Sequence, residues 1–118
     1  AFNWSVSLRY NGNYRVAKKN QMYYGIYGFQ TGSGDCYVMA STFYWMAKVA
    51  GYDAHYVTGY IKKGTKNGPH AWVEIRSNGK TYVYDPNFQK EYGSKGYTGY
   101  RITYGQKGTL KYIKKKVY

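Results

Sequence analysis

The side chains that could do chemistry in this sequence are few: one cysteine, two histidines and five acidic residues. A cysteine attacks a carbonyl carbon as its thiolate, and it needs a histidine to move the proton. Cys36 is the only thiol, and we predict that His70 is its base and that Asp85 orients His70. His55 is the alternative base, but the predicted strand that contains it has no acidic residue to orient its ring.

Each of these residues also has a purely structural interpretation. A lone cysteine is often a small buried apolar residue. Asp85 precedes Pro86, and an Asp-Pro pair can simply end a strand. Asp35, next to Cys36, also counts against the prediction because a nearby carboxylate disfavours a thiolate. The chemistry therefore depends on whether the fold brings the three side chains together.

The element that would position the cysteine is a helix. Residues 31–35 have the composition of a loop with capping residues, and Gly51 is a typical helix terminator, so we predict a helix over Cys36–Ala50. One face is small and apolar, with Cys36, Ala40, Phe43, Ala47 and Ala50 at helical spacing. That face should pack against a sheet, and the helix N-terminus would favour the thiolate.

The elements that would position the histidine and the aspartate are strands. We predict five extended runs: Ala54–Lys62, His70–Arg76, Lys80–Asp85, Tyr97–Tyr104 and Thr109–Val117. Asn78-Gly79 is a strong signal for a two-residue hairpin loop. That loop places Asp85 opposite Trp72, which puts His70 diagonally across from Asp85 on the same face. The other face of the hairpin is more apolar, so we expect both faces of the sheet to be covered.

The segments before the cysteine are less regular. Ala1–Leu8 has the apolar spacing of a short helix, and Tyr14–Tyr24 could be a second helix. The glycines at positions 25 and 28 indicate a loop after it.

Taken together, four groups of residues resemble the core of bacterial transglutaminase-like domains. They are Gly34-Asp35-Cys36-Tyr37, Gly51-Tyr52-Asp53-Ala54 with Val57-Thr58-Gly59-Tyr60, His70-Ala71-Trp72-Val73-Glu74, and Tyr84-Asp85-Pro86-Asn87-Phe88. The resemblance implies a papain-like α+β fold, in which N-terminal helices place the cysteine on a central helix packed against an antiparallel sheet. It also implies a single domain over residues 1–118 whose first helix begins slightly before residue 1.

The resemblance puts Cys36, His70 and Asp85 on the catalytic positions of the family. Gln30 has the spacing from the cysteine of the oxyanion glutamine in papain-like proteases, with Tyr23, Tyr24 or Tyr27 as alternative donors. We also expect Trp72 to contact the substrate. No cofactor or metal is expected, because the chemistry needs none and no acidic cluster indicates calcium.

The predicted function is acyl transfer or amide hydrolysis on peptide, protein or cell-wall peptide substrates through a thioester. An amine as acceptor would make the enzyme a cross-linking one, and water would make it an amidase or peptidase; loops such as Lys62–Pro69 would decide which. The alternative is a non-catalytic binding module with a basic, tyrosine-rich surface. We assign no motif to the tail after Tyr92.

The charge pattern limits the partners. The formal net charge of +13 attracts polyanions, but the basic residues are scattered and lie beside no nucleic-acid motif, so an anionic cell-wall polymer is a better candidate than specific nucleic acid. No apolar stretch is long enough to span a membrane, and one cysteine excludes an internal disulfide. We expect a secreted or cell-surface monomer, cut from a longer precursor because no signal peptide is visible.

Overall fold

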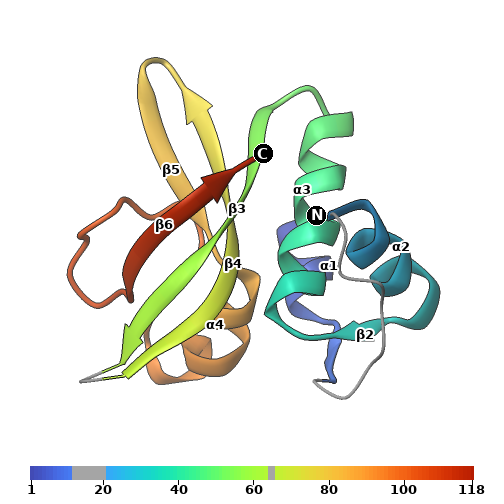
Figure 1. The fold of residues 1–118 in the computed structure, drawn as a ribbon, viewed down its shortest axis with the longest axis horizontal. Helices are drawn as coiled ribbons and strands as arrows, with labels where there is room; N and C mark the ends of the chain where they lie inside the picture. Colours follow the sequence, from blue (N-terminus) through green and yellow to red (C-terminus); the bar gives the residue numbers. More distant parts are fainter. Residues whose placement is uncertain (12–20, 64–65) are drawn as a thin grey trace.

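The computed structural model describes residues 1–11, 21–63 and 66–118 of the chain (Figure 1). Helices lie beside a four-stranded antiparallel sheet, so the predicted α+β class is confirmed. The helical elements are α1 (Phe2–Val6), α2 (Gln21–Thr31), α3 (Cys36–Val49), α4 (Pro86–Tyr92) and the short 3₁₀ helix η1 (Gly93–Lys95). No helix in the described part of the chain has the length and hydropathy that a membrane span requires.

The sheet has the strand order β5-β4-β3-β6. Its strands are β3 (Asp53–Lys63), β4 (Lys66–Ser77), β5 (Lys80–Tyr84) and β6 (Lys111–Val117). Two short strands, β1 (Arg9–Tyr10) and β2 (Ser33–Gly34), pair in parallel, and β2 leads directly into α3. Figure 1 shows α3 beside the sheet and α2 on the side of α3 that is away from the sheet. The helix that carries the cysteine is therefore held between a helix and the sheet.

The predicted hairpin register is confirmed. Ser77 pairs with Lys80, and Val73 pairs with Tyr84, so the next pair along the ladder would be Trp72 and Asp85. Asn78 and Gly79 have φ values of 52° and 77°, and two positive φ values are what the tightest hairpin turn requires. The prediction of a loop over Lys62–Pro69 is wrong, because β3 and β4 continue through most of it as paired strands.

Both faces of the sheet are covered, as predicted. Toward α3, the buried cluster contains Ala71, Val73 and Ile75 of β4, which pack with the apolar face of the helix. On the other face, alternate residues of the same strands form a second cluster with the C-terminal segment: Val57, Trp72, Val83 and Ile102. The alternation of side chains along β4 thus separates a purely apolar face from one that also carries His70 and Glu74.

The prediction of a loop around Gly25 and Gly28 is wrong, because both glycines lie within α2. Their role is close packing against α3. A Cβ atom at Gly25 would lie 2.7 Å from the Trp45 ring, and one at Gly28 would lie 2.6 Å from Thr42. Glycine is used here because the two helices approach each other closely. The predicted helix over Tyr14–Tyr24 lies mostly outside the described residues.

Three further predictions concern chain segments around the sheet. The predicted short helix at the N-terminus is confirmed as α1, and the last predicted strand is confirmed as β6. The predicted strand over Tyr97–Tyr104 is wrong: its backbone pairing with a strand of the sheet is one isolated bridge, between Ile102 and Val83 of β5. Arg101 has a φ of 52°, which breaks an extended strand next to that bridge. Helix α4 was not predicted: the Asp-Pro pair that ends β5 also begins this helix, with Asp85 as its N-cap.

Candidate active site

His70 and Asp85 form a buried pair on the face of the sheet that carries Trp72. His70 Nε2 lies 2.7 Å from Asp85 Oδ2, and the two residues are 2% and 0% exposed. The other carboxylate oxygen, Oδ1, accepts a hydrogen bond from the backbone N–H of Phe88 at 3.1 Å. Asp85 is therefore the N-cap of α4 as well as the partner of His70, so the helix that follows the strand holds the carboxylate in place.

Cys36 is the first residue of α3 and is partly exposed. The helix begins there because Asp35 caps it: the Asp35 carboxylate accepts hydrogen bonds from the backbone N–H groups of Tyr37 at 3.0 Å and Val38 at 3.3 Å. The helix N-terminus stabilises negative charge on a side chain beside it. The predicted conflict between Asp35 and the thiolate is thus reduced, because the Asp35 carboxylate is bonded to the end of the helix.

The Cys36 thiol lies close enough to His70 to help raise the pKa of the imidazole. His70 Nε2 is engaged by Asp85. Two elements distant in sequence, the start of α3 and the middle of β4, therefore meet at this point. The structure brings together the thiol, the imidazole and the carboxylate that the sequence singled out.

The electrostatics of the site favour a charged imidazole. Burial alone would lower the pKa of His70, but the charge of Asp85 and its hydrogen bond, helped by Cys36, outweigh burial and raise that pKa to about 10. His70 is therefore an imidazolium at neutral pH, flanked by a carboxylate on one side and sulfur on the other. This is the arrangement in which a thiolate is stabilised and a proton is ready for a leaving group.

The comparison with protein families agrees with this geometry. The model of the transglutaminase-like superfamily matches residues 2–86, which include α1 to β5 and all three side chains. The chain belongs to the transglutaminase-like superfamily. Its members typically carry out cysteine-dependent acyl transfer or hydrolysis. No curated protein matches this transglutaminase-like domain.

In the transglutaminase-like domain, the rival histidine lies elsewhere in the sheet. His55 pairs with Glu74 across the sheet, whereas His70 pairs with Gly59, so the two histidines lie four positions apart along β3, which is roughly 13 Å. The argument that no acid in its strand could orient His55 is wrong, because β3 begins at Asp53, whose carboxylate lies 2.8 Å from His55 Nε2. His55 is excluded as the base by its position along the sheet, four residues from the level of His70, and not by the lack of an acidic partner.

Two other residues, Gln30 and Trp72, were predicted for the site. Gln30 is exposed on the last turn of α2, and its role as oxyanion donor stays a prediction. Trp72 is 0% exposed, so a substrate does not reach it in this structure. Its indole stacks near the His70 ring with centroids 6.1 Å apart, and its N–H donates to the Tyr104 hydroxyl at 2.8 Å. We correct its expected role from contact with substrate to packing beneath the histidine.

Several tyrosines surround Cys36. Burial, followed by the nearby charges of Cys36 and Asp35, raises the pKa of Tyr37 to about 12. The same causes raise the pKa of Tyr24 and of Tyr56, and Tyr24 stacks on Tyr37 with ring centroids 5.7 Å apart. These phenols stay protonated at neutral pH and are hydrogen-bond donors near the sulfur. Tyr24 is one of the proposed oxyanion alternatives, and its pKa is raised by burial and by the nearby charges of Asp35 and Cys36.

The sequence did not reveal the polar network behind the site. Tyr104 donates a hydrogen bond to Glu74, a fully buried carboxylate that also binds Lys114 Nζ at 2.7 Å and Arg76 at 3.3 Å. Burial would raise the pKa of Glu74, but these donors lower it below its usual value. Tyr112 donates in the same way to Asp85. The C-terminal segment, for which no motif was assigned, therefore supplies partners for both buried carboxylates.

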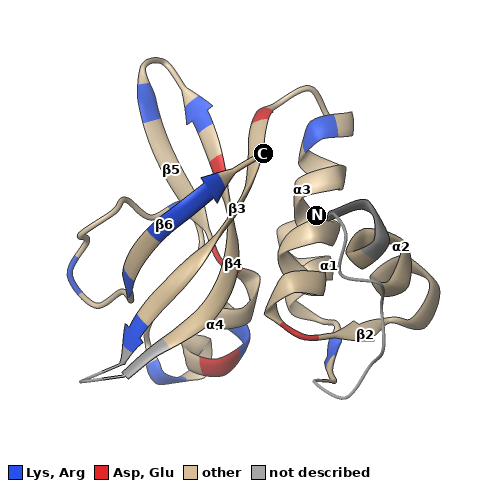
Figure 2. Ribbon diagram, in the orientation of Figure 1, with Lys and Arg blue, Asp and Glu red and all other residues tan. Residues whose placement is uncertain are grey.

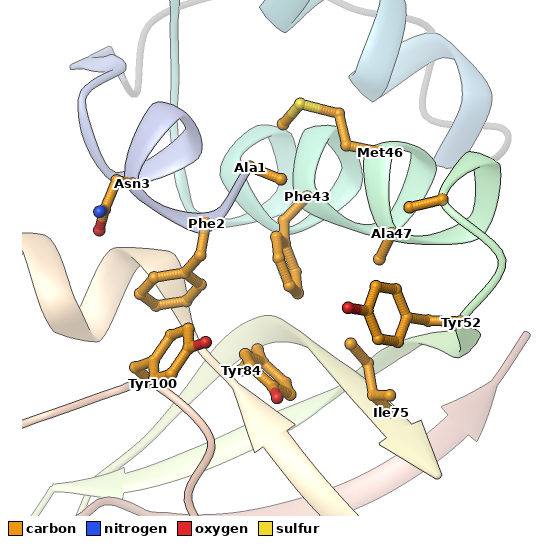
Figure 3. Close-up of a pocket in the computed structure, with 11 residues that line it drawn as sticks. Ala1, Phe2, Asn3, Phe43, Met46, Ala47, Tyr52, Ile75, Tyr84 and Tyr100 are labelled. Atoms are coloured by element: carbon orange, nitrogen blue, oxygen red, sulfur yellow. The ribbon is translucent and has the colours of Figure 1, made fainter. Parts of the chain in front are cut away.

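A pocket of about 480 Å³ lies apart from these residues, between α1, the second half of α3 and the edge of the sheet. Figure 3 shows Phe43 of α3 pointing into it toward Tyr84, with Phe2 and Tyr100 at one end. Met46, also on its wall, is ten residues after Cys36, or about 15 Å along the helix axis. The pocket is therefore separate from the candidate site. No group of metal-binding side chains occurs among the residues that the structure describes.

Proposed function

We propose that this domain is a cysteine enzyme that forms a thioester between Cys36 and the acyl group of a peptide or protein substrate. The observation that carries the proposal is the buried His70–Asp85 pair, with Cys36 at the start of a helix and close enough to help raise the pKa of the same imidazole. A structural cysteine has no need of a charged histidine beside it. An ordinary buried histidine would have a lowered pKa rather than a raised one.

The residues would act in two steps. In the first, the Cys36 thiolate attacks the carbonyl carbon, and the His70 imidazolium gives its proton to the departing ammonia or amine as the carbon–nitrogen bond breaks. In the second, the now neutral His70 takes a proton from the acceptor, which attacks the thioester and releases the Cys36 thiolate. Asp85 holds the ring so that one nitrogen faces the sulfur throughout, and it stabilises the imidazolium.

The substrate class we propose is a glutamine carboxamide or a peptide amide, including cell-wall peptides. Lysine as acceptor would give a cross-link, and water would give hydrolysis. We also propose a secreted or cell-surface location and an anionic wall polymer as partner. The net charge of +13 supports that partner. Figure 2 shows Lys and Arg on strands and loops across the sheet half of the domain.

A second candidate function is a non-catalytic binding module. The observation in its favour is that three of the five acidic side chains are used internally, which leaves most of the cations unbalanced at the surface. Glu74 and Asp85 are fully buried, and Asp35 caps α3. Lys62 and Lys116 are exposed on neighbouring strands at the edge of the sheet. A surface of this kind attracts a polyanion whether or not the thiol is reactive.

The decisive experiment is incubation with glutamine peptides, with and without a primary amine, followed by mass spectrometry of the protein and the peptides. The proposal expects a thioester on the single cysteine and either an amine adduct or a deamidated or cleaved peptide. The Cys36→Ala variant is the matched control and should give none of these products. Intact protein that forms no adduct with any peptide, and whose thiol is alkylated no faster at pH 6 than free cysteine, would favour the binding module.

A further inference from the structure

Tyr112 contacts the candidate site from β6, beyond the part of the chain that the family model matches. Its hydroxyl donates a hydrogen bond to Asp85 Oδ2 at 2.7 Å. The same oxygen lies 2.7 Å from His70 Nε2. With Phe88 N–H on Oδ1, the carboxylate has three donors, of which His70 and Tyr112 share one oxygen. Tyr112 and the imidazolium therefore compete directly for the same negative charge.

The local structure of β6 determines that Tyr112 reaches this position. Tyr112 pairs with Ile61, and Lys114 pairs with Gly59, before a register shift in which Lys116 pairs with Thr58. Tyr112 and Lys114 therefore share one face, the face of the two buried carboxylates, and the irregularity comes only after them. At Gly59 a Cβ atom would lie 2.0 Å from the carbonyl oxygen of Ile113. A glycine at this position is what lets β6 lie close enough for Tyr112 to reach Asp85.

The surroundings of Tyr112 keep it a donor. Its ring packs against Trp72 with centroids 4.8 Å apart and lies 6.4 Å from the His70 ring. Burial, followed by the charge of Asp85, raises its pKa well above the usual value. The phenol is therefore protonated at any pH at which the domain would work. Its hydroxyl group donates a hydrogen bond to Asp85, the carboxylate that the proposed reaction needs.

We propose that Tyr112 is a positioning residue of the site, which fixes Asp85 Oδ2 and withdraws part of the carboxylate charge from His70. This inference deepens the proposed function and rests on it. The charged and titratable groups that bear on the His70 ring are Cys36 from α3, Asp85 from the end of β5 and, through Asp85, Tyr112 from β6. By sharing the charge, Tyr112 makes the imidazolium a better proton donor than it would be with Asp85 alone.

The consequence concerns the thioester stage. Once Cys36 is acylated, its sulfur carries no charge, and Asp85 is the remaining anion against His70. If the carboxylate acted on the imidazole at full strength, the ring would stay protonated and could not take a proton from the acceptor. A second donor on the same oxygen weakens the effect of Asp85 on the pKa of His70, because a hydrogen bond to a carboxylate stabilises its charge and reduces its basicity.

The test is the titration of His70 by NMR in protein with labelled histidine, in the Tyr112→Phe variant and the natural sequence. His55, the other histidine, is an internal reference. The expected result is a His70 pKa higher by about half a unit to one unit, with His55 unchanged, because one pKa unit corresponds to about 1.4 kcal/mol and a charged hydrogen bond is of that size. An unchanged or lower His70 pKa in folded Tyr112→Phe protein would overturn the proposal.

The matched control is Tyr104→Phe, which removes a hydroxyl from the same face of the sheet without touching Asp85. An equal shift of His70 in this variant would assign the effect to general loss of packing and overturn the specific role of Tyr112. The titration needs no substrate. Failure of the proposed function would appear as a missing thioester while the Tyr112 shift is still observed, so the two failures are distinguishable.

A measurement on the unaltered protein covers the case in which Tyr112→Phe does not fold. A tyrosine hydroxyl buried against a carboxylate exchanges slowly with water, so its proton should give a resolved NMR signal with a cross-peak to the His70 ring. Gly59→Ala should remove that cross-peak by displacing β6, because its Cβ has no room beside Ile113. The absence of such a signal in the unaltered protein would contradict the proposed bond.

Discussion

The domain contains two histidine–aspartate pairs that have nearly the same hydrogen-bond distance but differ in burial and in their other partners. His70 Nε2 lies 2.7 Å from Asp85, and His55 Nε2 lies 2.8 Å from Asp53. The side chains of the first pair are 3% and 0% exposed, and those of the second are 23% and 61% exposed. The first pair has Cys36 near its imidazole, whereas His55 Nδ1 contacts the backbone carbonyl of Tyr118.

The difference shows that hydrogen-bond distance alone does not identify a catalytic pair. Around Asp53, water screens the carboxylate, so its charge acts weakly on the ring. Around Asp85, protein replaces water, and each remaining donor is fixed: Phe88 N–H on one oxygen and Tyr112 on the other. Burial together with a complete set of partners is what turns a common pair into one that can hold a charged imidazole beside a thiol.

The largest effect should come from removing the two histidines in turn. We predict that His70→Ala lowers the rate of thioester formation at pH 7 by about 10² to 10⁴, the usual contribution of a general acid–base group. His55→Ala should change it by less than about threefold, because His55 lies roughly 13 Å along the strand from the level of His70. The measurement is the rate of cysteine acylation by mass spectrometry. Equal losses in both variants would remove the distinction between the pairs.

The second prediction compares the two acids. Asp85→Asn keeps an oxygen for the α4 cap but removes the charge that holds His70 protonated, so the pKa of His70 should fall below about 10 and the acylation rate should fall by about 10². Asp53→Asn should leave both unchanged. Histidine NMR and the acylation assay measure the two quantities on the same samples. A His70 titration that Asp85→Asn does not move would show that the carboxylate is not the source of the raised pKa.

The third prediction is that the free energy of unfolding depends on pH through the protonation of His70. The folded pKa of His70 is raised to about 10 from an ordinary value of 6.5, so the folded state binds the proton more tightly than the unfolded chain. Its stabilisation is present in full below about pH 6.5 and is lost as the pH rises through about 10. The free energy of unfolding of the natural protein relative to His70→Asn should therefore decrease over that window.

Urea denaturation at several pH values measures this difference, and subtraction of the variant removes the titration of the lysines and tyrosines that both proteins share. A relative stability that rises between pH 6.5 and 10 would contradict the assignment of a charged His70.

The part of the site that follows from local rules could be predicted from the sequence. The loop Asn78-Gly79 fixes the parity of the hairpin, and parity alone puts His70 and Asp85 on one face. The cap before Cys36 fixes where α3 begins. Both signals depend on a few neighbouring residues, so no knowledge of the rest of the fold was needed.

The rest of the site depends on contacts between distant segments. Gly25 and Gly28 have the composition of a loop, and only the presence of α3 at close range explains a helix there. Tyr112 lies in a correctly predicted strand, but which carboxylate it reaches depends on pairing with β3 and on the register shift near Gly59. The sequence contains 18 tyrosines, and nothing in their local pattern separates this one from the others.

The smallest predicted effect is the energy of the exposed pair itself. A double-mutant cycle with Asp53→Ala and His55→Ala should give a coupling of less than about 0.5 kcal/mol at pH 7, because exposed ion pairs are screened by water. The same cycle on Asp85 and His70 should give about 2 kcal/mol or more, since removal of one buried partner leaves the other without compensation. Chemical denaturation of the six variants and the natural protein measures both couplings. If the exposed pair gave the larger coupling, burial would not be what distinguishes the two pairs, and the raised pKa of His70 would need another cause than Asp85 in a water-free site.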